Sequence, residues 1–149
     1  MNLLIGTAEN YKLDSKGRLS LPTKWRERLG KEFYTTVVKV HGYKCLTLYP
    51  EEKFVAMYEA MQQGSENLNY DTIAEFTDFA EETVLDAQGR FTVNQRQKAE
   101  VGMSNETTVL FKGRGDSIEI WDTEIFKQMQ KNKNGDGIFD LMDRQKGGE

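Results

Sequence analysis

The chain has 149 residues, of which 38% are hydrophobic and 30% are charged, a composition typical of globular proteins and unlike that of disordered chains. At this length we expect about two-thirds of the unfolded surface to be buried, in one compact domain or in two small ones that share a core. No stretch approaches the roughly 20 apolar residues of a membrane span, and the first residues lack the basic lead-in of a signal peptide. Cys45 is the only cysteine, which excludes an intrachain disulfide and favours a cytoplasmic location.

The net charge of −4 is distributed unevenly along the chain. Residues 1–30, 31–50 and 87–114 carry net charges of +3, +2 and +3, whereas residues 51–86 and 115–149 carry −9 and −3. A fold that brings the basic segments together would give one positive face and one negative face, and a positive face suits a nucleic acid. The alternative is that the charges only keep the surface solvated.

An internal repeat organises the sequence. A shift of 72 positions aligns the two halves without a gap, and we interpret this as a true duplication. Residues 13–18 (Leu-Asp-Ser-Lys-Gly-Arg) fall on residues 85–90 (Leu-Asp-Ala-Gln-Gly-Arg). The same shift places residues 35–37 on residues 107–109, both Thr-Thr-Val.

Each unit is expected to contain the same elements. Residues 11–13 and 18–21 flank an Asp-x-x-Gly sequence, which predicts a type I turn with a left-handed glycine and hence a β-hairpin. A proline then begins a short helix over residues 24–29, which a glycine ends. Residues 35–40 and 45–49 alternate on either side of a turn, and they predict a second hairpin.

Helical spacing follows the second hairpin. Pro50 is expected to begin a helix with one apolar face, formed by Phe54, Met57, Tyr58 and Met61. An acidic segment over residues 69–80 has a similar spacing. The second unit is expected to repeat the strands, at residues 83–85, 90–93, 107–112 and 117–121. A helix over about residues 123–131 follows, and then a tail rich in glycine and asparagine.

These elements predict an α+β fold with an internal twofold repeat. We expect two β-rich modules, at residues 5–50 and 77–122, an acidic helical connector at residues 51–76, and a helix with a mobile tail at residues 123–149. A module of this size cannot bury both faces of its sheet alone. The two copies should therefore pack against each other, and further copies from other chains can do the same.

The repeat singles out Asp-x-x-x-Arg, which occurs as Asp14 to Arg18 and as Asp86 to Arg90. In a turn the aspartate accepts hydrogen bonds from backbone N–H groups, and the glycine supplies the positive φ. The arginine that follows can pair with a carboxylate, a phosphate or a guanine edge. The alternative is that aspartate and arginine only pair with each other. The candidate structural residues of the turns are Asp14, Gly17, Asp86 and Gly89.

Cations gather around the first Asp-x-x-x-Arg sequence more densely than around the second. Near the first lie Lys12, Lys16, Lys24, Arg26 and Arg28, whereas the second has only Arg96 and Lys98 beside Arg90. A basic cluster next to a two-stranded ribbon suits phosphate contacts and groove readout. The predicted DNA-binding residues are Lys16, Arg18, Lys24, Arg26 and Arg90.

Residues 11–26 (YKLDSKGRLSLPTKWR) resemble the N-terminal signature of the MraZ family, and residues 85–90 and 117–122 resemble its second copy. The resemblance extends over residues 5–130. It implies two tandem AbrB-like modules of the swapped-hairpin β-barrel type with short connecting helices. It further implies a ring-shaped homo-oligomer in the cytoplasm, at the nucleoid. This ring would bind short direct repeats of double-stranded DNA upstream of the bacterial division and cell-wall gene cluster.

The resemblance also implies that Arg18 and Arg90 contact DNA. The second unit departs from the family pattern, since Val93-Asn94-Gln95 stands where the family shows an Ile-Pro pair similar to Leu21-Pro22. Together with its smaller basic cluster, this departure predicts a weaker DNA contact by the second unit.

An enzyme is the main alternative class of function. His41 and Cys45 are too few for a zinc site, and Cys45 alternates with apolar residues, as a core residue does. The sequence contains no Gly-rich phosphate loop and no nucleophile elbow. We therefore expect neither enzymatic activity nor a cofactor or metal. Residues 132–143 space oxygen ligands as an EF-hand does, but the first ligand is Asn and the exit helix is short, so a flexible tail is preferred to a calcium site.

A second alternative is an antitoxin-like AbrB-type module that binds a protein partner instead of a promoter. Antitoxins of this kind carry one module and a long disordered tail, whereas this chain has two modules and a short tail. The acidic segment over residues 51–86 remains a candidate surface for such a partner.

Overall fold

The computed structural model describes residues 3–64, 70–133 and 142–143. The order strand, strand, short helix, strand, strand, helix occurs twice, so the α+β class and the duplicated order of elements are confirmed. Repeat 1 consists of β1 (Leu4–Lys12), β2 (Arg18–Ser20), α1 (Thr23–Leu29), β3 (Glu32–Val40), β4 (Tyr43–Pro50) and α2 (Glu51–Gln63). After α3 (Tyr70–Asp78), repeat 2 consists of β5 (Glu81–Val84), β6 (Arg90–Thr92), α4 (Gln95–Val101), β7 (Thr108–Gly115), β8 (Ile118–Asp122) and α5 (Thr123–Asn132).

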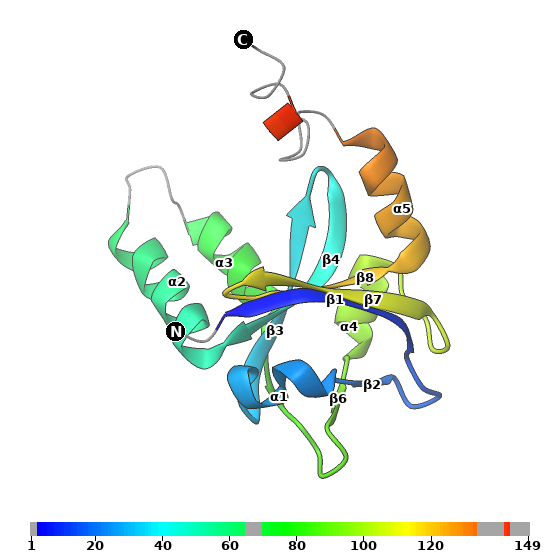
Figure 1. Cartoon of the computed structure of the whole chain (residues 1–149). Coiled ribbons are helices and arrows are strands. Elements are labelled where there is room, and N and C mark those ends of the chain that lie inside the picture. Colours follow the sequence, from blue (N-terminus) through cyan, green and yellow to red (C-terminus); the bar gives the residue numbers. More distant parts are fainter. Residues whose placement is uncertain (1–2, 65–69, 134–141, 144–149) are drawn as a thin grey trace.

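The two repeats share their sheets. Six strands form one antiparallel sheet in the order β1-β7-β8-β4-β3-β5, and β2 pairs with β6 in a separate ribbon (Figure 1). Thus β1 of repeat 1 pairs with β7 of repeat 2, and β5 of repeat 2 pairs with β3 of repeat 1. At the centre, Leu46 pairs with Ile120 and Leu48 with Ile118, which makes an approximate twofold axis between β4 and β8. Neither repeat therefore has a complete sheet of its own.

The predicted hairpin of residues 11–13 with residues 18–21 is wrong, although its turn is present. Gly17 has a φ of +76° and its N–H donates to the carbonyl oxygen of Asp14 at 3.0 Å. Beyond the turn, however, the chain separates, and β1 and β2 each pair with a strand of repeat 2. A hairpin with such short strands is marginal alone. Pairing of β2 with β6 instead places Leu19 and Phe91 in a shared core.

The gapless register of the repeat is also wrong over one strand. In repeat 1 the partners Val37 and Leu46 are nine residues apart, whereas in repeat 2 the partners Gly113 and Ile118 are five apart. The β3–β4 hairpin is therefore four residues longer than the β7–β8 hairpin. The structural counterpart of each β3 residue lies 76 positions later, so residues 35–37 do not correspond to residues 107–109.

The four residues by which the β7–β8 hairpin is shorter are balanced by four extra residues between α4 and β7. The Leu13 N–H donates to the carbonyl oxygen of Thr107 at 3.1 Å, whereas its counterpart, the Leu85 N–H, donates to Lys31 at 2.9 Å. Thr107 and Lys31 are again 76 positions apart. Residues 103–106, which we call the inserted loop, consequently have no counterpart in repeat 1. The two length differences cancel, and for this reason an ungapped alignment could not show them.

The short helix α1 is present as predicted, with Trp25 and Leu29 buried. Its counterpart α4 is also present, as the repeat predicts, although Asn94 stands where repeat 1 has Pro22. The Asn94 side chain accepts a hydrogen bond from the N–H of Gln97 at 2.8 Å, which is a favourable N-cap. The departure from the family pattern thus preserves the helix by another means.

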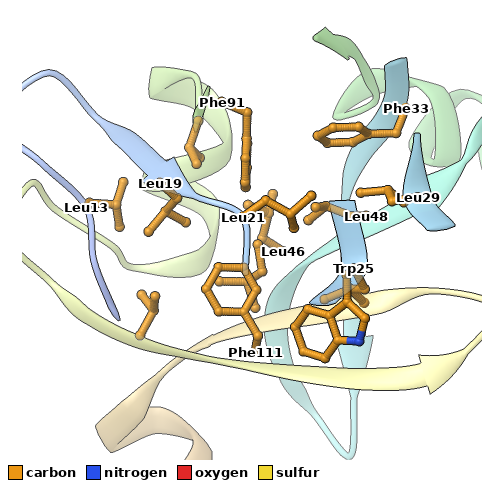
Figure 2. Close-up of a cluster of buried hydrophobic side chains, with 14 of the residues drawn as sticks. Leu13, Leu19, Leu21, Trp25, Leu29, Phe33, Leu46, Leu48, Phe91 and Phe111 are labelled. Atoms are coloured by element: carbon orange, nitrogen blue, oxygen red, sulfur yellow. The ribbon is translucent and has the colours of Figure 1, made fainter. Parts of the chain in front are cut away.

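The main core is built from both repeats. Figure 2 shows Leu19 and Leu21 of repeat 1 beside Phe91 of repeat 2. Phe33 meets Phe91 edge to face, with ring centroids 5.6 Å apart, so an aromatic contact also joins the repeats. The side chains of this core contribute to stability only when both repeats are folded.

A smaller core lies under α5 and contains Cys45, Leu110, Trp121, Phe126 and Met129. Burial raises the pKa of the Cys45 thiol to about 12, so this thiol is a poor nucleophile. The prediction that Cys45 is a core residue is confirmed. His41 lies on the exposed turn between β3 and β4.

The acidic helices α2 and α3 pack through aromatic rings. Phe54 stacks on Tyr34 with ring centroids 4.1 Å apart and on Phe76 at 5.0 Å. Of the predicted apolar face of α2 only Phe54 is buried, and Tyr58 remains 37% exposed.

Most of the EF-hand-like segment, residues 132–143, lies outside the described residues. Among the described residues, no helix is both long and apolar enough to cross a membrane.

Candidate nucleic-acid interface

Turn 1 (residues 14–18) is organised by one carboxylate. Oδ1 of Asp14 accepts hydrogen bonds from the backbone N–H groups of Lys16 and Arg18, each at 2.9 Å. Oδ2 accepts from Nε of Arg18 at 2.8 Å. The backbone N–H of Arg18, followed by its guanidinium, lowers the pKa of Asp14 to about 2. The carboxylate is therefore charged at neutral pH and fixes the direction of the arginine.

Turn 2 (residues 86–90) repeats this arrangement. Oδ1 of Asp86 accepts from the N–H groups of Gln88 and Arg90, each at 2.9 Å, and Oδ2 accepts from Nε of Arg90 at 2.9 Å. The backbone N–H of Arg90 is again the main cause that lowers the pKa of Asp86. The two turns are thus geometric copies of each other, as their sequences predict.

The two arginines lie on one face of the β2–β6 ribbon. Arg18 is paired with Thr92 and Ser20 with Arg90. Successive side chains in a strand alternate between faces, and the intervening Leu19 is buried, so both arginines are on the opposite face. Strand geometry places their Cα atoms roughly 8 Å apart. Figure 1 shows both turns projecting from the lower part of the molecule, whereas α2 and α3 lie at the upper left.

The ion pairs with aspartate leave the terminal guanidinium nitrogens of both arginines available to bind a ligand. A guanidinium has five N–H donors, and Asp14 takes only the one on Nε of Arg18. Within the described part of the chain, the terminal nitrogens of Arg18 have no hydrogen-bond partner, and Arg90 has one longer contact, to Gln88 at 3.3 Å. Pairing with aspartate is therefore compatible with binding a phosphate or a guanine edge through the two terminal nitrogens.

The other predicted cations differ in their contacts. Lys16 is exposed at the tip of turn 1. Nζ of Lys24 donates to the carbonyl oxygen of Thr7 at 2.9 Å and lies 4.6 Å from the ring centroid of Trp25. Nε of Arg26 donates to the carbonyl oxygen of Leu21 at 2.7 Å. Lys24 and Arg26 therefore have structural contacts in addition to any contact with a ligand.

Lys24 belongs to a group of side chains on α1 that covers the open edge of β1. Arg28 donates to the carbonyl oxygen of Leu3 at 2.8 Å, and the Trp25 indole donates to that of Ile5 at 2.9 Å. Lys24 donates to Thr7, so three alternate carbonyl groups accept hydrogen bonds from α1, one just before β1 and two within it. An edge covered in this way is protected against pairing with another chain.

Each turn glycine lies against a cation of the other repeat. A Cβ atom added to Gly89 would be 2.3 Å from Cζ of Arg26, and one added to Gly17 would be 2.9 Å from Nζ of Lys98. Arg26 and Lys98 are equivalent in the 72-residue repeat. Lys98 is 9% exposed and was absent from the predicted site. Its alignment with Arg26 was the signal that could have identified it.

Comparison with known proteins identifies the family of the chain. The model of the MraZ protein family, described as antitoxin-like, matches twice, over residues 4–74 and 76–146, which confirms the duplication. The chain is 30% identical over 139 residues to the transcriptional regulator MraZ of Finegoldia magna, covering 88% of this chain and 94% of that protein. It is 36% identical over 115 residues to the protein of the same name from Corynebacterium jeikeium, covering 76% and 77%. The chain belongs to the MraZ family.

Proposed function

We propose that this protein is a sequence-specific DNA-binding regulator of transcription, and that the β2–β6 ribbon is its DNA-binding element. The observation that carries the proposal is the placement of Arg18 and Arg90 on the outward face of this ribbon, each directed by an aspartate. The relatives named above are transcriptional regulators by name. The major groove of B-DNA admits a two-stranded ribbon, and arginine reads guanine there or binds phosphate.

The module boundaries follow from the same proposal. Residues 5–50 and 77–122 are the two AbrB-like modules, and their interleaved strands support a swapped-hairpin β-barrel. Residues 51–76 and 123–149 are accessory segments. The acidic helices of residues 51–76 lie away from the ribbon, so their charge does not repel DNA at the contact surface (Figure 1). The protein acts without enzymatic activity, cofactor or metal, in the cytoplasm at the nucleoid.

The proposed target is a set of short direct repeats upstream of the division and cell-wall gene cluster. One ribbon presents only two arginines, so a single chain would bind weakly. Several ribbons held at a fixed spacing gain affinity through their effective concentration. We therefore propose a ring-shaped homo-oligomer. Light scattering at micromolar concentration should give a multiple of 17.2 kDa, and a mass of one chain would contradict the ring.

A genomic DNA selection tests the proposed function. The purified protein should enrich a small set of fragments that share a short repeated sequence, and the double variant Arg18→Ala, Arg90→Ala should not. Arg114→Ala is a matched control, because Arg114 also forms a partly exposed ion pair, with Glu119 at 2.9 Å, but on β7 instead of the ribbon. Equal enrichment by wild type and double variant would reject the ribbon as the DNA site.

A protein-binding role, as in antitoxins, is the alternative function. The family description contains the term antitoxin-like, and α3 has no buried residue, with Tyr70 82% exposed. A stoichiometric protein recovered with the chain, together with failure to enrich any DNA, would favour this alternative.

A further inference from the structure

Turn 1 is held by residues of repeat 2, through contacts that turn 2 lacks. The Asn105 side chain, in the inserted loop of residues 103–106, donates from Nδ2 to the carbonyl oxygen of Ser15 at 2.9 Å. In the same loop, the backbone N–H of Glu106 donates to the carbonyl oxygen of Leu13 at 2.9 Å. These two contacts tie turn 1 to the inserted loop.

Lys98 completes the arrangement. Its Nζ donates to Oδ1 of Asn105 at 3.0 Å, and the same nitrogen is the nearest atom to a Cβ that would be added at Gly17. Lys98 is nearly buried, yet it forms no ion pair with a described residue. A buried ammonium group is costly to desolvate. The charge of Lys98 is not neutralised by a described carboxylate, and it lies beside turn 1. The amide of Asn105 is therefore fixed at both ends, by Lys98 and by Ser15.

The counterpart contacts on turn 2 are different. Arg26, the counterpart of Lys98, donates to Leu21 of its own repeat and contacts Gly89 by packing. No side chain of the described residues donates to the carbonyl oxygen of Ala87, which is the counterpart of Ser15. The difference arises because the inserted loop exists only in repeat 2.

We infer that Asn105 and Lys98 are positioning residues for Arg18, and that they make turn 1 the more strongly bound of the two DNA contacts. A fixed turn loses less conformational freedom when its arginine binds DNA, so more of the interaction energy appears as affinity. This inference rests on the proposed function, because it concerns the same ribbon. It assigns the expected difference between the two turns to the inserted loop and to Lys98 on α4.

A double-variant experiment tests the inference. The probe is a labelled duplex of the fragment most enriched by the wild-type protein, and affinity is measured by fluorescence anisotropy. Asn105→Ala should weaken binding about 3- to 10-fold in the wild-type background, the effect of one lost hydrogen bond. The same loss should occur in the Arg90→Ala background. In the Arg18→Ala background, Asn105→Ala should have no further effect, because it acts only through Arg18.

Two further variants separate positioning from folding. Asn105→Asp keeps an acceptor for Lys98 but loses the donor to Ser15, so it should reproduce the loss of Asn105→Ala. Ser104→Ala changes the same loop, but the Ser104 side chain contacts Thr107 and not turn 1, so affinity should be unchanged. All measurements are made well below the melting temperature of each variant, which is recorded by circular dichroism.

The outcomes distinguish the inference from the proposed function. Equal losses from Asn105→Ala in the Arg18→Ala and Arg90→Ala backgrounds, or no loss in any background, would overturn the positioning role and leave the DNA site intact. Unchanged affinity of Arg18→Ala itself would overturn both the positioning role and the proposed site.

Discussion

The guanidinium group of Arg26 lies directly against Gly89, on the turn of the other repeat. A Cβ atom at Gly89 would be 2.3 Å from Cζ and 2.4 Å from Nη1 of Arg26, so no other residue fits without displacing this side chain. Gly89 also has a φ of +78°, in the left-handed region that favours glycine. Any other residue at this position therefore adopts a strained backbone and displaces the Arg26 guanidinium.

Gly89→Ala should therefore destabilise the protein more than a substitution that changes only the backbone preference. Gly42→Ala is the matched control, because Gly42 has a φ of +85° and nothing within 4 Å of its added Cβ. Both variants should lose about 1–2 kcal/mol from the left-handed backbone. Gly89→Ala should lose about 1 kcal/mol more, because displacing the Arg26 guanidinium breaks its hydrogen bond to the carbonyl oxygen of Leu21. Urea unfolding measures both values, and equal losses would show that Arg26 moves away freely.

The interleaved strands predict that repeat 1 cannot fold alone. A fragment of residues 1–64 contains β1 and β2, but their partners β7 and β6 belong to repeat 2. The fragment also lacks Phe91 and Phe111, which belong to the main core. We expect a monomeric fragment to show no cooperative thermal transition by circular dichroism. Mixing it with residues 70–149 should restore the transition. A cooperative transition of the monomeric fragment alone would contradict the shared core.

The depressed pKa of Asp14 predicts a pH dependence of stability. In the folded protein this pKa is about 2, below the ordinary value of 3.8, so the charged carboxylate stabilises the fold. The contribution is fully present above pH 3.8 and is lost as the pH falls towards about 2. Asp14→Asn should thus be less stable than wild type at neutral pH, and the difference should shrink over this window. A difference in unfolding free energy that stays constant from neutral pH to about pH 2 would contradict the assignment.

Local features of the sequence predicted local structure well. The Asp-x-x-Gly turns, the helix after Pro22 and the hairpin of β3 with β4 all depend on residues that are close in the chain, and all are present. The partners of β1 and β2 could not be predicted in this way. β1 has nine residues but β2 has only three, so the two strands gain little from pairing with each other, and burial in a core shared by both repeats decides their partners.

The candidate site could be predicted only in part for a similar reason. Arg18 and Arg90 follow directly from the repeated motif and lie together on the ribbon. Lys98 and Asn105 are far from turn 1 in the sequence, and only the paired strands bring them next to it. The inserted loop was concealed because its extra length is compensated by the shorter β7–β8 hairpin.

The DNA-binding role of the ribbon is tested by the DNA affinity of Arg18→Ala, measured over a series of salt concentrations together with its melting temperature. The Arg18–Asp14 pair is partly exposed, so its loss should cost at most about 1 kcal/mol of stability. If Arg18 contacts a phosphate, its loss should lower affinity for all sequences and reduce the salt slope by about 1 per contact. If Arg18 contacts a guanine, its loss should instead cost roughly 1–3 kcal/mol of binding free energy and relax the preference at one base pair.

We expect a large loss of affinity for Arg18→Ala, increased because every subunit of the oligomer carries the substitution, with a nearly unchanged melting temperature. Arg90→Ala should change affinity in the same direction but less, because turn 2 lacks the contacts of the inserted loop. Unchanged DNA affinity of Arg18→Ala with a lowered melting temperature would contradict the account, and it would make the Asp-x-x-x-Arg turn a purely structural element.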